Sequence, residues 1–165
     1  MKNLLKKIVR YNYWANEKFV SVLSEIAPKH LDITVKSSFP SIRKTLFHIW
    51  DAEVLFLNRI QGISLDSFPS RKYPLTTPIE KILRTSKELR DFVESADDDF
   101  FQRICTYKNT HGEEFSQPNS DLIMHCMNHS TFHRGQIITI LRSLGYTAFP
   151  QTDLIHFLRA GGNDK

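Results

Sequence analysis

The stretch from Asn119 to Gly145 constrains the fold more than any other part of the chain. It has the pattern of one long helix, in which His125, His129 and His133 recur at spacings of four. Because an α-helix turns about 100° per residue, a step of four moves a side chain only about 40° around the axis. The three imidazoles therefore share one side of the helix. Apolar residues lie on or near the same side: Leu122, Ile137, Ile140 and Leu144. We expect this side to face an apolar interior.

Three further segments have the apolar spacing of α-helices: residues 3–27, 42–61 and 77–96. Pro28 ends the first, and Ser41 is the expected N-cap of the second. Thr77 to Glu80 forms a capping-box pattern at the start of the third. Four long amphipathic helices predict an all-α fold, a four-helix bundle. The connector over residues 62–76 is long, so a simple up-down-up-down order does not follow from the sequence.

The segment before the last long helix has a different pattern. Residues 103–107 and 113–115 flank the turn composition Asn109 to Gly112, which predicts a small β-hairpin inserted before that helix. A short last helix is expected within residues 151–159. We therefore predict a single domain over residues 1–160 and a flexible C-terminal tail over residues 161–165.

Composition excludes several classes of protein. Of 165 residues, 41% are hydrophobic and 24% charged, as in globular domains, and no apolar run approaches the roughly 20 residues of a membrane span. The N-terminus lacks the pattern of a signal peptide, and two cysteines do not make a disulfide framework, so we expect a cytoplasmic protein without membrane association. The net charge of +4 comes from scattered residues, so no nucleic-acid partner is expected.

The histidine spacing indicates a metal site. Two histidines four residues apart on a helix can chelate one ion, which fits either His129 with His133 or His125 with His129. A further ligand has to come from a facing helix, and His48 is the candidate in the second predicted helix. Three neutral imidazoles leave coordination positions open, as in catalytic sites. Cys126 is the rival ligand, although a buried small side chain is the simpler role for it.

Other interpretations of these histidines fit the sequence less well than a metal site. A single histidine on an apolar helix face is usually a core or capping residue, but three on one face each need partners, which favours a metal. The zinc-protease helix needs a Glu directly after its first histidine, and Ser130 stands there. The di-iron bundle pattern, a Glu three residues before a His in two helices, is also absent from the sequence.

Several polar residues near the histidines are candidates for supporting roles. Asp51 and Glu53 follow His48 closely, and either could orient a ligand or accept a proton, although a solvated surface position is as good an interpretation for Asp51. Arg134 could bind an anionic group or pair with an acid on the third helix. Gly135 in a helix interior costs about 1 kcal/mol relative to Ala, which suggests close approach of a neighbouring helix.

Three segments resemble the DinB family, which is related to the YfiT-like metal-dependent hydrolases. They are HCMNHSTFHRGQI over residues 125–137, TLFHIWDAEVLFLNRI over 45–60 and YNYWANEKFV over 11–20. The resemblance implies a four-helix bundle that holds a divalent metal, zinc or nickel, through His48, His129 and His133. His125 then becomes a neighbour of the ligands, as do Arg134 and Gln136. Family resemblance also implies a homodimer.

The resemblance leads to a functional hypothesis with one alternative. We expect a metal-dependent enzyme, a thiol S-transferase or hydrolase, that acts on a small molecule and uses a low-molecular-weight thiol in the transferase case. Glu53 or Asp51 would be the proton acceptor. The alternative is a non-catalytic metal-binding module of a stress response.

Overall fold

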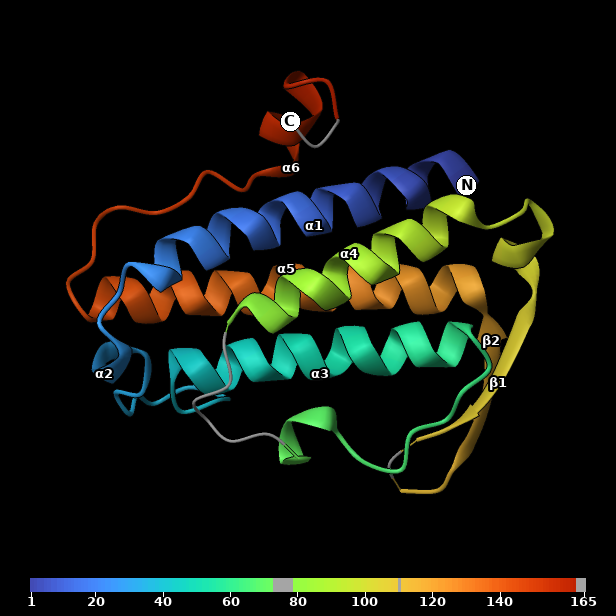
Figure 1. Ribbon diagram of the computed structural model, residues 1–165, viewed down its shortest axis with the longest axis horizontal. Coiled ribbons are helices and arrows are strands. Elements are labelled where there is room, and N and C mark those ends of the chain that lie inside the picture. Colours follow the sequence, from blue (N-terminus) through green and yellow to red (C-terminus); the bar gives the residue numbers. More distant parts are fainter. Residues whose placement is uncertain (73–78, 110, 163–165) are drawn as a thin grey trace.

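The computed structural model describes residues 1–72, 79–109 and 111–162, and four long helices make up most of it. They are α1 (Lys2–Ser24), α3 (Ile42–Ile60), α4 (Glu80–Ser95) and α5 (Asn119–Ser143). α1 packs against α4 and α5, while α3 packs against α4 and α5 from the other side. The predicted four-helix bundle is confirmed (Figure 1).

The order of the helices is not simple up-down-up-down. In Figure 1, α1 and α5 run in one direction and α3 and α4 in the other, so the consecutive helices α3 and α4 are parallel. The connection from Gln61 to Ile79 has to return along the length of the bundle, and it contains the 3₁₀ helix η1 (Pro69–Lys72). This long return explains why the sequence has a connector of that size.

The helix boundaries follow local signals. The Ser41 hydroxyl accepts a hydrogen bond from the backbone N–H of Lys44, at 3.2 Å, which confirms it as the N-cap of α3. Gly145, with φ of +87°, follows α5 and donates its N–H to the carbonyl of Arg142. The predicted end of the first helix is wrong, because α1 ends at Ser24 and Pro28 instead begins the four-residue helix α2 (Pro28–Leu31). The capping box predicted at Thr77 lies outside the described residues.

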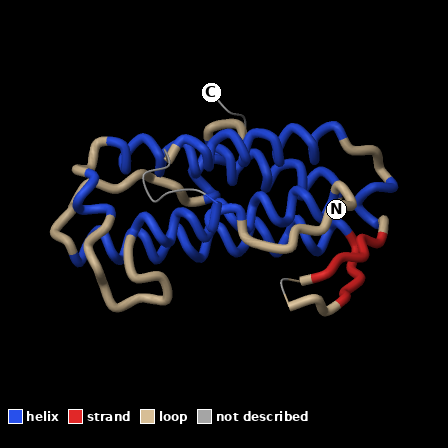
Figure 2. Tube along the Cα trace, turned by 60° about the horizontal axis from the view of Figure 1, so that its bottom comes forward, coloured by secondary structure: helices blue, strands red, loops and turns tan. Residues whose placement is uncertain are grey.

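The predicted hairpin is present at one end of the bundle (Figure 2). Strands β1 (Ile104–Lys108) and β2 (Glu114–Pro118) are antiparallel, with Tyr107 opposite Phe115. The 3₁₀ helix η2 (Asp99–Gln102) precedes β1, and β2 leads directly into α5. The hairpin therefore fixes the start of the helix that carries the histidines.

The C-terminal segment returns along α1 (Figure 1). Helix α6 (Leu154–Arg159) inserts Phe157 against the rings of Tyr11 and Trp14, with centroids 5.9 and 5.5 Å away. Gly162 donates its N–H to the carbonyl of Phe157, so this part of the predicted tail is bonded to α6. The rest of that tail, residues 163–165, lies outside the described residues.

Most of the described core belongs to two apolar clusters separated by a polar layer, and a smaller third cluster contains Tyr11, Ala15 and Phe157. One of the two larger clusters, at the hairpin end, contains Val9 and Phe56, and the other contains Phe19 and Ile137. Buried polar side chains lie at intermediate positions on the four helices: Asn12, Asn16, Glu53, Ser86, Ser130 and Arg134. No helix within the described residues is long and apolar enough to cross a membrane.

Candidate metal centre

Three histidines meet at the seam between α3 and α5. His48 projects from α3, while His129 and His133 project from successive turns of α5. One nitrogen from each ring lies within 4.8 Å of the others, and the Nε2 atoms of His48 and His129 are 2.8 Å apart. Within the described part of the chain, this is the group of histidine, cysteine and carboxylate side chains arranged to share one ion.

The donor atoms suit a divalent transition metal. Burial lowers the pKa of His48 to about 4, with a smaller contribution from His133. Burial likewise lowers the pKa of His129 to about 3, and the neighbouring His133, His48 and His125 contribute. The rings of His48 and His129 are therefore neutral at pH 7, and each has a lone pair that a metal can bind. Neutral imidazoles bind zinc and nickel well, with zinc–nitrogen distances of about 2.0–2.1 Å.

One buried ring nitrogen of the histidine cluster lacks a hydrogen-bond partner in the described part of the chain. The Nδ1 atom of His129 is buried and has no hydrogen-bond partner among the residues that the structure describes. A buried imidazole nitrogen without a partner is uncommon in proteins. His133 differs, because its Nδ1–H donates to Gln136 Oε1 at 2.7 Å, which leaves Nε2 free to coordinate. Gln136, expected beside the ligands, thus orients one of them.

Two phenylalanines enclose the cluster, and the sequence analysis did not identify them. Phe39, from the segment before α3, stacks on His48 with centroids 4.0 Å apart and meets His133 edge-on at 5.5 Å. Phe132 contacts His133 at 5.1 Å, although its own side chain is 62% exposed. In the sequence, Phe39 is separated from the α3 N-cap Ser41 by Pro40, and that position is too general a signal to assign a role.

His125 and Cys126 are outside the ligand group. His125 is exposed, and its ring lies 6.0 Å from that of His129 and 5.0 Å from that of Phe56. The expectation that all three histidines face an apolar interior is therefore wrong for His125. Cys126 is fully buried in the hairpin-end core, and burial raises the pKa of its thiol well above the usual value. It has the simpler role of a small core residue.

Asp51 and Glu53 have partners other than the histidines. Asp51 accepts hydrogen bonds from the backbone N–H and hydroxyl of Ser70, at 2.8 and 2.6 Å, and so attaches η1 to α3. Glu53 is five residues after His48, which turns it about 140° away around the helix. These positions do not support a proton-accepting role for either carboxylate at the histidine cluster.

Glu53 and Arg134 belong to the polar layer of the core. Glu53 accepts hydrogen bonds from Asn12 and Asn16 at 2.7 and 2.9 Å, and from the hydroxyls of Ser86 and Ser130. Arg134 donates to the side-chain oxygens of the same two asparagines at 2.6 and 2.9 Å. The expected pairing of Arg134 with an acid on the third predicted helix is therefore wrong, and these buried hydrogen bonds do not support the expected role in binding an anionic group. It is linked to Glu53 on α3 through two amides.

Gly135 is not needed for close packing. It is exposed, and a Cβ added there would have no atom within 4 Å, so the expected neighbouring helix is absent from the described structure around it. Gly135 instead lines a surface cavity of about 500 Å³ together with Gln136 and Phe132. The remaining lining residues are Val35, Lys36, Ser37, Thr139, Ile140 and Ser143.

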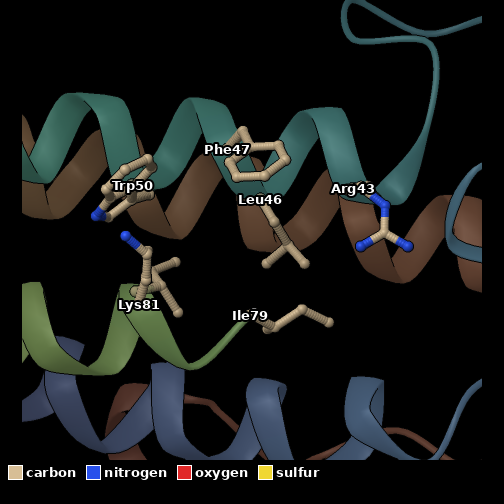
Figure 3. A pocket seen from close by; sticks show the side chains of 7 residues that line it. Arg43, Leu46, Phe47, Trp50, Ile79 and Lys81 are labelled. Carbon is tan, nitrogen blue, oxygen red and sulfur yellow. The ribbon is translucent and has the colours of Figure 1, made fainter. Parts of the chain in front are cut away.

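A second cavity lies on the other side of α3 and is too small to be the site. It has a volume of about 20 Å³ and lies between α3 and the start of α4 (Figure 3). Its walls are mostly apolar: Arg43, Leu46, Phe47, Trp50, Ile79, Lys81 and Ile82. Such a volume accommodates about one water molecule. The histidine cluster is not part of its lining.

The fold and the histidine cluster define a class: four-helix bundles with a three-histidine site between two helices. A sequence model of the DinB family matches residues 1–164. The chain therefore belongs to the DinB family, as its motifs indicated.

Individual relatives agree with this assignment. The chain is 25% identical to Protein DinB of Bacillus subtilis (strain 168) over 159 residues, which is 91% of each chain. A DinB-like protein (YjoA) from the same organism superposes with a TM-score of 0.65 at 18% identity, covering 88% of this chain and 96% of the other.

Two further solved structures share the fold. YfiT from Bacillus subtilis, described as a probable metal-dependent hydrolase with an unusual four-helix bundle topology, has a TM-score of 0.65 at 13% identity and covers 89% and 91% of the two chains. A DinB-like protein from Bacillus cereus has a TM-score of 0.57 at 22% identity and covers 81% and 88%. At these identities the likeness establishes the fold alone.

Proposed function

We propose that this protein is a metal-dependent enzyme in which His48, His129 and His133 hold one divalent ion, zinc or nickel. The observation that carries the proposal is the convergence of three imidazoles from two helices, with one nitrogen of each within 4.8 Å of the others. Such a ligand set leaves coordination positions for water or substrate, which distinguishes catalytic from structural zinc sites.

The chemistry that follows is hydrolysis or thiol transfer to a small molecule. A bound divalent ion lowers the pKa of a coordinated water or thiol toward neutrality and so supplies a nucleophile at pH 7. The protein holds the imidazoles in place through Gln136 and the stacked ring of Phe39. The description of YfiT as a probable metal-dependent hydrolase is consistent with this class of reaction.

The cavity beside Gly135 is the proposed binding place for the substrate. Gln136 lines it and also accepts the hydrogen bond from His133, so the cavity begins directly next to a proposed ligand. Its volume of about 500 Å³ is in the range of small-molecule sites. Phe132 and Val35 supply apolar contact, and Lys36 supplies a cation at the rim.

The proposal is tested by turnover. Purified protein loaded with zinc or nickel is assayed against small electrophiles with a panel of cellular thiols, and against ester and amide substrates without thiol. We expect turnover with one of these classes in the wild type, and a loss of about 10²-fold or more in His133→Ala, because the metal-bound nucleophile supplies much of the rate. His111→Ala, which removes an exposed histidine of the hairpin turn, is the matched control and should keep its activity.

Two outcomes would contradict the proposal. One is turnover that survives in His133→Ala at the wild-type rate, which would place the reaction elsewhere. The other is stoichiometric metal without turnover in any assay, which would favour the non-catalytic metal-binding module.

A further inference from the structure

Arg59 is a buried arginine near the hairpin end of α3. Only 7% of the residue is exposed. Its guanidinium carbon lies 4.1 Å from the centroid of the Tyr107 ring and 5.0 Å from that of the Phe56 ring. Cation–π contacts of this kind fix the orientation of a guanidinium but use none of its N–H donors.

The hydrogen-bonding groups of Arg59 lack protein partners. Its Nε is buried and unpaired, and its side chain forms no hydrogen bond or ion pair within the described residues. The other buried arginines are different: Arg134 donates to two asparagines and Thr131, and Arg43 pairs with Asp32. Burial lowers the pKa of Arg59, but an arginine in a protein remains charged. A buried N–H donor without a hydrogen-bond partner, such as the Nε–H of Arg59, is uncommon in proteins and calls for a reason.

A cavity of about 380 Å³ opens beside this guanidinium. Arg59, Phe56 and Tyr107 form one part of its wall, and polar side chains from β2 and the first turns of α5 form another: Gln117, Asp121 and His125. Asp121 is exposed and makes no ion pair with Arg59. The cavity therefore offers a fixed cation, an amide and an imidazole to a small ligand.

We propose that this cavity is an anion subsite, in which Arg59 binds the oxyanion group, carboxylate or phosphate, of a small molecule. A planar guanidinium with free N–H donors matches an oxyanion through paired hydrogen bonds. The rings of Tyr107 and Phe56 hold the guanidinium in place before the ligand arrives, which reduces the entropy lost on binding.

The subsite lies one helical turn along α5 from the histidine cluster. His125 lines the cavity, and its ring is 6.0 Å from that of His129. Arg59 itself is about 16 Å from His48 along α3, so a ligand held by Arg59 would occupy a place separate from the proposed metal centre. The anion binding itself requires no metal, so it stands or falls separately from the proposed enzymatic function.

Nuclear magnetic resonance can detect anion binding at Arg59 itself. Uniformly ¹⁵N-labelled protein is titrated with acetate, with inorganic phosphate and with chloride as a control for ionic strength, and the Nε–H resonance of Arg59 is recorded. This resonance reports anions at Arg59 and not anions bound elsewhere, including at a metal. We expect a saturable shift of this resonance with acetate or phosphate but not with chloride. The anion that binds more tightly shows whether the subsite prefers a carboxylate or a phosphate group.

Variants separate a binding role from a structural one. Arg59→Gln should weaken the binding of the tighter anion, measured by calorimetry, by about tenfold or more, because paired charge-assisted hydrogen bonds are lost. Arg84→Gln, which removes an exposed arginine of α4, is the matched control and should bind as the wild type does. Asp121→Asn removes a negative charge from the cavity wall and should tighten binding by about threefold.

The Asp121 variant keeps the test decisive if Arg59→Gln fails to fold. Tighter binding in folded Asp121→Asn supports the subsite, because general damage to the structure would weaken it. The proposal is overturned if neither anion shifts the Arg59 resonance in the wild type, or if folded Arg59→Gln binds as tightly as the wild type. Arg59 would then serve only to attach the hairpin to α3.

Discussion

At the scale of single residues, the polar layer in the core shows how a buried charge pair is accommodated. Glu53 and Arg134 do not touch in an ion pair; Asn12 and Asn16 stand between them, each donating to the carboxylate and accepting from the guanidinium. Burial raises the pKa of Glu53, while the hydrogen bonds from Ser86 and the asparagines and the charge of Arg134 lower it. The layer joins α1, α3, α4 and α5 at one level.

Removing one charge of this layer should be costly. Glu53→Ala leaves the buried Arg134 without a compensating charge, and we expect a loss of about 3–5 kcal/mol in the free energy of unfolding. Urea denaturation followed by circular dichroism measures it. Glu88→Ala, on the exposed face of α4, is the matched control and should change stability by no more than about 0.5 kcal/mol. If Glu53→Ala loses less than about 1 kcal/mol in the free energy of unfolding, this account of the polar layer is wrong.

Spacing on the last long helix indicated two possible pairs, His125 with His129 and His129 with His133, and the family resemblance favoured the second. The presence of one histidine in another buried helix indicated His48, and the structure brings His48, His129 and His133 together. The contacts of Glu53 and Arg134 did not follow from the sequence. Their partners, Asn12 and Asn16, are on α1, and no local pattern connects residues so far apart in sequence.

At the scale of elements, α5 carries a glycine in its interior that packing does not explain. Gly135 has an ordinary helical φ, is exposed, and would accept a Cβ without contact. The helix therefore bears the conformational cost of glycine without a steric reason. Gly135 does line the cavity beside Gln136, so the open surface at this point belongs to the proposed substrate site.

Gly135→Ala should stabilise the protein by about 0.5–1 kcal/mol, because alanine favours the helix and restricts the unfolded chain. Thermal unfolding measures the change. Gly145→Ala is the control in the same helix region: its φ of +87° is unfavourable for alanine, so this variant should be destabilised. Destabilisation of Gly135→Ala would show that a neighbour does approach this position.

Local sequence predicted which segments form helices or strands more completely than it predicted where these elements begin and end. Apolar spacing predicted the four long helices, and turn composition predicted the hairpin between Lys108 and Glu114. The short helix α2 was not predicted, because Pro28 was interpreted as the end of the first helix, whereas α1 ends at Ser24 and Pro28 begins α2. Proline is favourable at a first helical position, which explains why it stands at the start of α2.

At the scale of the whole molecule, the helix order determines the site. α3 and α4 are parallel, and the returning connection lets α3 lie against α5, which brings His48 to His129 and His133 (Figure 1). Periodicity identifies the buried face of each helix but not the helix it faces. The neighbour relations therefore could not be derived from apolar spacing alone. The resemblance to a known family agreed with the choice of His48 and selected His129 and His133, rather than His125, as its partners on α5.

The metal content of purified variants tests the three-histidine site most directly. Elemental analysis should find stoichiometric divalent metal in the wild type and in His125→Ala, whose ring is exposed and outside the ligand group. His129→Ala and His133→Ala should each lose it, because two imidazoles hold an ion much less tightly than three, while circular dichroism shows the helical content largely unchanged. Full metal retention in both variants would contradict the assignment.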